Sequence, residues 1–150
     1  MTEASNTEKM AAEKIMALQS GISAFETKQF VRAHQLLSSL AEDGDVEAQY
    51  RLAIMAQNGL GMVVNTKDAE RWMRAAAETG FDLAQHGLGF MYMQGECVEK
   101  NAAEAVKWFS LAAEQGLAGA QTTLGSMYEQ GEGVEKDLEE AKRWYAKAGF

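Results

Sequence analysis

The chain has 150 residues, enough for one domain with a continuous core, and its composition of 47% apolar and 24% charged residues is that of an ordered protein. Its formal net charge of −8 repels phosphate backbones and anionic membrane surfaces, which argues against a nucleic-acid or membrane partner. It contains no proline, which breaks helices internally, so we expect an almost wholly helical chain with short turns.

The N-terminal segment does not have the pattern of a targeting signal. A signal peptide needs a basic start and an unbroken apolar stretch, whereas Glu3, Glu8 and Glu13 interrupt the first residues. No segment approaches the roughly 18 apolar residues of a membrane span. A single cysteine, Cys97, cannot form an internal disulfide. We therefore expect a cytoplasmic protein without membrane insertion.

Helical spacing of apolar residues predicts two helices at the start of the chain, over residues 6–24 and 28–42. From Ala48 onwards the sequence repeats every 36 residues without a gap, and all three tryptophans fall in one column of the repeat. Each repeat has the pattern of two helices joined by a glycine-marked turn. The predicted helices of these repeats are 46–58, 66–79, 82–94, 102–115, 118–130 and 138–148.

Capping residues mark the ends of the second helix in each repeat. An Asn or Asp precedes the helix, with an acidic residue three positions later, as in Asn101 and Glu104. The other two such pairs are Asn65 with Asp68 and Asp137 with Glu140. Gly80 and Gly116 follow second helices, where a left-handed residue ends a helix at low cost.

The same 36-residue shift extends backwards to a degenerate first repeat. It predicts that Ala12 corresponds to Ala48 and Met16 to Leu52. In the second helix it aligns Ala33, Leu36, Ala41 and Gly44 with residues one repeat later. We therefore expect one helical-repeat domain over 1–150, with a degenerate first repeat (12–47), full repeats (48–83 and 84–119) and a truncated last repeat (120–150).

The tryptophan of each second helix is expected to fill the gap between neighbouring repeats. Trp108 would then be buried by repeats on both sides, whereas Trp144 has no repeat beyond it. Because stability in a solenoid comes from stacking neighbours, we expect Trp108→Ala to cost more stability than Trp144→Ala.

The runs LGFMYMQGECVEKNAAEAVKWFSLAAEQG and LGSMYEQGEGVEKDLEEAKRWYAKA resemble Sel1-like repeats, which are relatives of tetratricopeptide repeats with a longer turn inside each helix pair. The first repeat, with AFETKQFVRA, looks closer to a tetratricopeptide unit. The resemblance implies an all-α fold, a right-handed α–α superhelix (solenoid) of about four helix-turn-helix repeats whose first helices line a concave face. It also implies an adaptor or scaffold that binds proteins.

No arrangement of residues in the sequence indicates catalysis. The two histidines, His34 and His86, lie in different repeats and neither has the spacing of a metal site. Cys97 shares a column with Gly61 and Gly133, so we interpret it as a turn residue in preference to a reactive thiol. We predict that the protein is not an enzyme and carries no metal and no cofactor.

A protein-binding groove is predicted on the concave face, where first-helix positions that the repeat core does not use should lie. These positions are Tyr50, Arg51, Ile54, Gln57, Leu83, His86, Phe90, Met93 and Gln94. The same columns of the last repeat hold Thr122, Thr123, Ser126 and Glu129, so that end should be polar. Exposed apolar clusters usually mark binding sites. The alternative is that these residues pack on one another in a tightly curled superhelix.

A second possible contact patch consists of Leu60, Val63 and Val64, in a turn where the other repeats carry charges. It is either a contact surface, such as a dimer seam, or neutral variation. The leading function is thus a non-catalytic interaction module that binds a protein or peptide in its groove. If His86 lies in that interface, affinity should change over about pH 5.5–7.5. The alternative is a structural homo-oligomer, such as a homodimer, that assembles through the 60–64 turn and the last repeat.

Overall fold

The computed structural model describes residues 2–150, which form eight helices and no strand. They divide into two compact units, one ending at Trp72 and the other beginning at Met73. None of the described helices is both long and apolar enough to cross a bilayer. The all-helical repeat architecture predicted from the sequence is confirmed.

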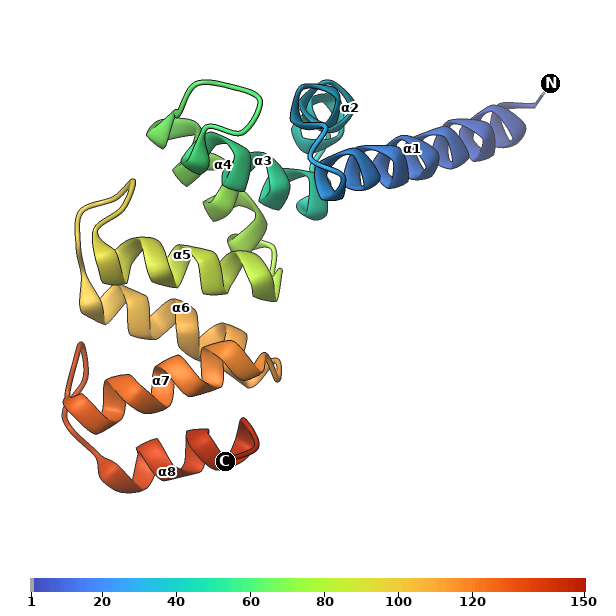
Figure 1. Ribbon diagram of the computed structural model, residues 1–150. Coiled ribbons are helices and arrows are strands. Elements are labelled where there is room, and N and C mark those ends of the chain that lie inside the picture. Colours follow the sequence, from blue (N-terminus) through green and yellow to red (C-terminus); the bar gives the residue numbers. More distant parts are fainter. Residues whose placement is uncertain (1) are drawn as a thin grey trace. The chain divides into compact units, whose positions relative to one another are not determined.

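The helices follow the predicted pattern of pairs (Figure 1). The first unit contains α1 (Glu3–Glu26), α2 (Phe30–Glu42) and α3 (Val46–Asn58). The boundary between the units falls inside α4 (Thr66–Glu78). The second unit contains α5 (Asp82–Gln94), α6 (Ala102–Glu114), α7 (Ala118–Gln130) and α8 (Leu138–Lys147), which stack as successive layers in Figure 1.

The predicted caps explain where the second helices begin and end. The Asn101 carboxamide oxygen accepts the Glu104 backbone N–H at 3.1 Å, and Asn65 does the same for Asp68 at 3.0 Å. Asp137 accepts the backbone N–H groups of Glu139 and Glu140 at 3.1 Å each. At the other ends, Gly80 and Gly116 have left-handed φ values of 96° and 94°.

The long turn inside a repeat brings its second glycine against the preceding repeat. Gly133 has φ 73°, and a Cβ built on it would overlap the backbone of Ala102, whose carbonyl carbon would lie 2.6 Å away. Gly61 is seated in the same way on Phe30 and Val31 at the start of α2. At Gly61 and Gly133 a side chain would overlap this backbone, because the turn touches the first residues of a neighbouring second helix.

The first repeat departs from the predicted register by one helical turn. Ala12 and Met16 are exposed, Met16 at 66%, whereas Gly21 and Ala24 are the buried residues of α1. The turn between α1 and α2 has three residues (27–29), against seven between α5 and α6 (95–101). Deleting four residues from the turn shifts the helix before it by about one turn. The alignment of Ala12 and Met16 with Ala48 and Leu52 is therefore wrong.

The first helix, predicted over 6–24, is longer at both ends and spans Glu3–Glu26. Its residues up to Met16 are all exposed. The second-helix register of the first repeat is confirmed, because Ala33 and Ala41 are 0% and 1% exposed and Gly44 has φ 98°.

A column of glutamines links each first helix to the helix before it. All three are more than nine-tenths buried, and each Nε2 donates to a carbonyl in the last turn of the preceding second helix. The pairs are Gln49 with Ala41 (3.1 Å), Gln85 with Ala77 (3.3 Å) and Gln121 with Ala113 (3.1 Å). A buried amide needs such partners, so this column holds each repeat on its neighbour.

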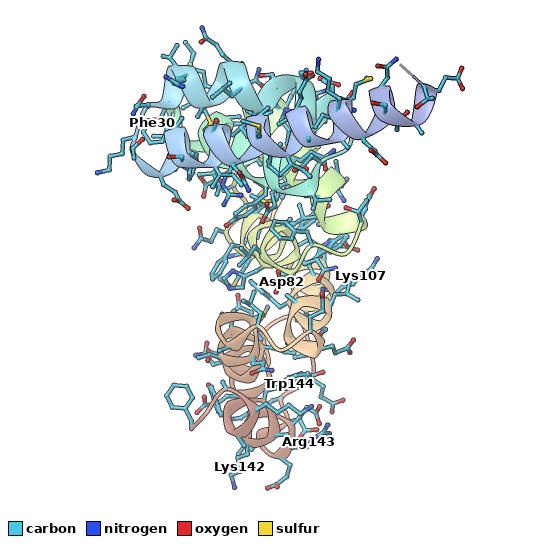
Figure 2. The ribbon with its side chains drawn as sticks, turned by 90° about the vertical axis from the view of Figure 1, so that its right-hand side faces the viewer. Phe30, Asp82, Lys107, Lys142, Arg143 and Trp144 are labelled. Atoms are coloured by element: carbon cyan, nitrogen blue, oxygen red, sulfur yellow. The ribbon has the colours of Figure 1, made fainter. Side chains whose placement is uncertain are left out.

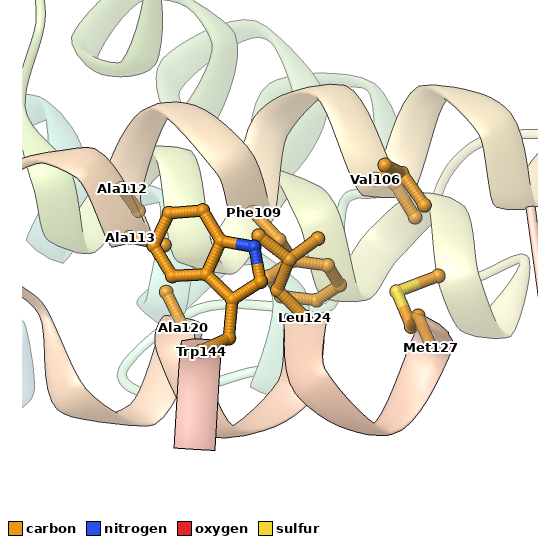
Figure 3. Packing of buried hydrophobic residues seen from close by; sticks show 9 residues of the cluster. Val106, Phe109, Ala112, Ala113, Ala120, Leu124, Met127 and Trp144 are labelled. Atoms are coloured by element: carbon orange, nitrogen blue, oxygen red, sulfur yellow. The ribbon is translucent and has the colours of Figure 1, made fainter. Parts of the chain in front are cut away.

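The core of the second unit is a cluster of alanines, aliphatic side chains and two aromatic rings between α6, α7 and α8 (Figure 3). Trp144 lies beside Ala112 and Ala113 of α6 and Ala120 of α7. It is 7% exposed, the same as Trp108. Trp144 therefore packs back onto the preceding repeat and needs no repeat beyond it, so the expected difference between the two tryptophans has no basis in burial.

Candidate functional site

The residues predicted to form the groove lie on α3 in the first unit and on α5 in the second. Most of them are half-buried, and two are exposed: Leu83, at 39%, and Gln94. Each of the two groups forms its own surface within its unit.

In the first unit, Arg51 does not project freely from α3. Its guanidinium carbon lies 5.8 Å from the centre of the Phe25 ring, and Nη1 donates to the Glu47 carbonyl at 3.3 Å. Its Nε is buried without a hydrogen-bond partner among the described residues. Phe25 in turn packs edge-on against Phe30, with ring centres 5.7 Å apart. The sequence missed Phe25 because its position depends on the shifted register of α1.

In the second unit, His86 and Phe90 form an aromatic cluster with Phe109 of α6. The ring centres are 4.8 Å apart for His86–Phe90, 5.6 Å for His86–Phe109 and 5.1 Å for Phe90–Phe109, and all three contacts are edge-to-face. Phe109 is fully buried, whereas the other two reach the surface. The sequence left open whether these residues pack on one another, and His86 and Phe90 do so. Each of the two side chains is still partly exposed.

Burial lowers the pKa of His86 below its ordinary value, and the nearby Asp82 carboxylate opposes this effect only in part. The ring also faces Gly119 of α7, where a built Cβ would lie 3.4 Å from Nε2. The glycine leaves room for the imidazole but offers it no acceptor side chain. The neutral imidazole is therefore favoured. The pH range over which His86 should affect binding accordingly moves below the range expected from its ordinary pKa.

We expect stability to fall on acidification through His86. A pKa that is lower in the folded than in the unfolded chain adds stability above about pH 6.5, which is lost as the pH falls toward the folded value. The midpoint of urea unfolding should therefore drop less between pH 7 and pH 5 in His86→Gln than in the wild type. His34→Gln controls for removal of a histidine elsewhere. An unchanged pH dependence of stability in His86→Gln would contradict the conclusion that burial lowers the pKa of His86.

Beside the polar columns of its first helix, the last repeat also carries apolar surface. Thr122, Tyr145 and Phe150 line a pocket of about 310 Å³, and Phe150 is 83% exposed. The Tyr145 hydroxyl donates to the Glu129 carboxylate at 2.7 Å. Only Thr122 and Glu129 belong to the columns read from the sequence. The apolar walls come from α8 and the residues after it, which the comparison of first helices did not include.

The 60–64 turn carries the expected apolar surface. Val63 is 87% and Val64 53% exposed, whereas Leu60 is half-buried. Because Gly61 rests on the start of α2, the exposed Val31 (61%) adjoins this turn.

Cys97 adopts the conformation of the turn glycines. Its φ of 67° matches 68° at Gly61 and 73° at Gly133, which supports its interpretation as a turn residue. Within residues 2–150 no group of three His, Cys, Asp or Glu side chains is placed to hold a metal ion.

Comparison with known families matches three segments of the chain, 46–81, 82–117 and 118–149, to the Sel1 repeat. Each matched segment starts at the first residue of a first helix, α3, α5 or α7. No match was found among curated proteins.

Solved structures with a similar fold include other repeat proteins of this kind. A Sel1 repeat protein from Oxalobacter formigenes is 35% identical with a TM-score of 0.83, over 87% of this chain and 54% of that one. The antigen c5321 of uropathogenic Escherichia coli, which displays an SLR fold, is 34% identical with a TM-score of 0.86, over 99% of this chain and 33% of that one. The chain thus spans about half and a third of these two relatives. Helicobacter pylori cysteine rich protein B, at 20% identity and a TM-score of 0.63 over 81% of this chain and 87% of that one, shares the fold.

Proposed function

The chain belongs to the Sel1 repeat family, and from that premise we propose that it is a non-catalytic scaffold or adaptor that binds a peptide or helix of another protein through exposed residues of its first helices. Proteins of this family are generally protein-interaction scaffolds. The observation that carries the proposal is the half-exposed aromatic edge of His86 and Phe90, next to the exposed Leu83, on α5.

This edge suits a partner side chain for two reasons. Its rings are held rigidly, because both pack edge-to-face on the buried Phe109. Rigid aromatic groups lose little entropy on binding and often dominate interface energy. The half-buried Met93, on the same helix, adds an adaptable apolar surface.

Two leucines of matched exposure allow a direct test. Leu83 on α5 is 39% exposed, and Leu111 on the second helix α6 is 38% exposed. A protein captured from an extract of the producing cells would first be identified and purified, and its affinity then measured by calorimetry. We expect Leu83→Asp to weaken binding at least about tenfold and Leu111→Asp to leave it unchanged.

Melting temperatures of both variants provide the control for folding. Equal binding by the two variants would contradict the proposal that first-helix residues bind the partner. Phe90→Ala and Tyr50→Ala are expected to weaken binding by about 1–3 kcal/mol. Because Phe90 also packs on Phe109, its effect counts only for the fraction that remains folded.

The second candidate is a homo-oligomer that assembles through the 60–64 turn and the last repeat. It is favoured by the exposure of Val63, because large exposed aliphatic side chains often mark contacts. Val63→Glu with Val64→Lys would install the residues that occupy these positions in the next repeat, Glu99 and Lys100. If the wild type is larger than a monomer by light scattering, this double variant should be monomeric. A monomeric wild type excludes the candidate.

A further inference from the structure

We propose that Arg51, on the surface that α1 and α3 form in the first unit, binds an acidic side chain of the partner protein, a glutamate or aspartate with apolar neighbours. The inference rests on the proposed function, because Arg51 is one of the first-helix residues expected to meet the partner. It names the chemistry that this part of the protein recognises.

The Arg51 side chain is held in place before any ligand binds. Its guanidinium carbon lies 5.8 Å from the centre of the Phe25 ring, and its Nη1 donates to the Glu47 carbonyl at 3.3 Å. Phe25 is braced by Phe30, with ring centres 5.7 Å apart. Figure 2 shows Phe30 at the end of the α1–α2 pair that lies opposite the first turns of α1. Because the arginine is already positioned, little side-chain entropy is lost when it binds a ligand.

The guanidinium group of Arg51 has unused donors. Its one hydrogen bond within residues 2–150 is that of Nη1, and its Nε is buried without a partner there. The ion pairs described in the first unit are those of Lys14 and Arg71 and do not include Arg51. A buried N–H without a partner costs free energy. Nε and Nη2 lie on one edge of the guanidinium group, so a single carboxylate can accept from both.

Apolar side chains flank this donor edge on both helices. Ile54 lies one turn after Arg51 on α3, and Ile22 lies one turn before Phe25 on α1. Residues three apart share one face of a helix, and both isoleucines are half-buried. Apolar neighbours reduce the screening of an ion pair by water. A partner acid that itself has apolar neighbours therefore fits this surface better than one in a wholly charged segment.

The charge of the chain favours a carboxylate over a phosphate. Both groups match the fork of a guanidinium ion. The chain has 22 acidic and 14 basic residues, and its net charge of −8 repels a doubly charged phosphate more strongly than a singly charged carboxylate. The acidic ligand is therefore a glutamate or aspartate side chain.

The test uses the 150-residue chain and two tripeptides blocked at both ends, Leu-Glu-Leu and Leu-Gln-Leu. Glutamine keeps the shape of glutamate but carries no charge. Binding is followed by nuclear magnetic resonance at the Arg51 Nε–H signal. We expect a saturable shift with the glutamate peptide and an affinity about threefold to tenfold lower for the glutamine peptide. The Nε–H signal of Arg32, an exposed arginine on α2, should not move.

A pair of arginine variants locates the site. Arg51→Lys keeps the positive charge but removes the planar fork, so it should weaken binding of the glutamate peptide about threefold to tenfold. Arg32→Lys is the matched control and should leave this affinity unchanged. Melting temperatures show whether each variant is folded. The comparison of the two peptides uses the wild type, so it decides the matter even if Arg51→Lys does not fold.

Three results would overturn the inference: equal affinity of the wild type for the two peptides, no saturable shift of the Arg51 Nε–H signal, or unchanged affinity in a folded Arg51→Lys. None of them bears on whether Leu83→Asp loses the natural partner, so the two proposals fail separately.

Discussion

Trp144→Ala is expected to lower the free energy of unfolding by about 3–5 kcal/mol, as much as Trp108→Ala. Both indoles are 7% exposed, and Trp144 is enclosed by alanines of α6 and α7 although it lies in the last helix. A lysine also covers each ring, with Lys147 4.5 Å and Lys107 5.9 Å from the ring centres. Urea unfolding of the two variants measures the comparison.

The losses of stability in Trp144→Ala and Trp108→Ala can differ in their physical cause. The Trp108 indole nitrogen is buried without a hydrogen-bond partner among residues 2–150, which offsets part of what burying the ring contributes. If Trp144→Ala cost less than half as much as Trp108→Ala, the inference that these tryptophans pack back onto the preceding repeat would be wrong. Lys147→Ala serves as a control, because an exposed cation over a ring contributes only about 0.5–1 kcal/mol.

Gly133→Ala is expected to destabilise the protein by about 2–5 kcal/mol. Part of this, about 1–2 kcal/mol, is the cost of a side chain at positive φ, because Gly133 has φ 73°. The rest, about 1–3 kcal/mol, is overpacking, because the new Cβ would overlap the backbone of Ala102, which cannot move without disturbing the start of α6.

Gly116→Ala is the matched control for the backbone term. Gly116 has φ 94°, yet nothing lies within 4 Å of a Cβ built on it. It should therefore cost only about 1–2 kcal/mol. Thermal and urea unfolding of both variants give the difference. Equal losses of stability in Gly133→Ala and Gly116→Ala would show that the backbone around Ala102 moves to accept the new Cβ. The 131–136 turn would then not hold neighbouring repeats rigidly against each other.

Most of the helical framework could be read directly from the sequence. The helices of the three repeats were predicted to within one residue at both ends, because their signals are local: apolar residues at helical spacing, a cap such as Asn101 and a left-handed Gly116. The 36-residue period also identified the buried columns, since residues such as Ala84 and Leu88 repeat wherever the same neighbour recurs.

The errors arose where the period itself breaks. In the first repeat the shorter 27–29 turn moves α1 by one helical turn, so that Gly21 takes the buried place and Met16 is exposed. A gap of four residues is hard to place in a degenerate repeat. At the other end, α8 is three residues shorter than α6, so the 36-residue shift pairs Phe150 with Glu114. In the structure Phe150 takes the place of Leu117 instead, with its backbone N–H on the Tyr145 carbonyl and its ring beside that of Tyr145.

The sequence by itself therefore determined the repeat, the helix ends and the core columns, because these depend on residues within a turn or two of one another. Only the tertiary structure decided three features: the direction in which Trp144 packs, the enclosure of His86 by Phe90 and Phe109 that lowers its pKa, and the hydrogen bond from Tyr145 to Glu129. These features join residues from different helices. Their distances depend on how closely small residues such as Gly119 and Gly125 let the helices approach, which a single-chain pattern does not encode.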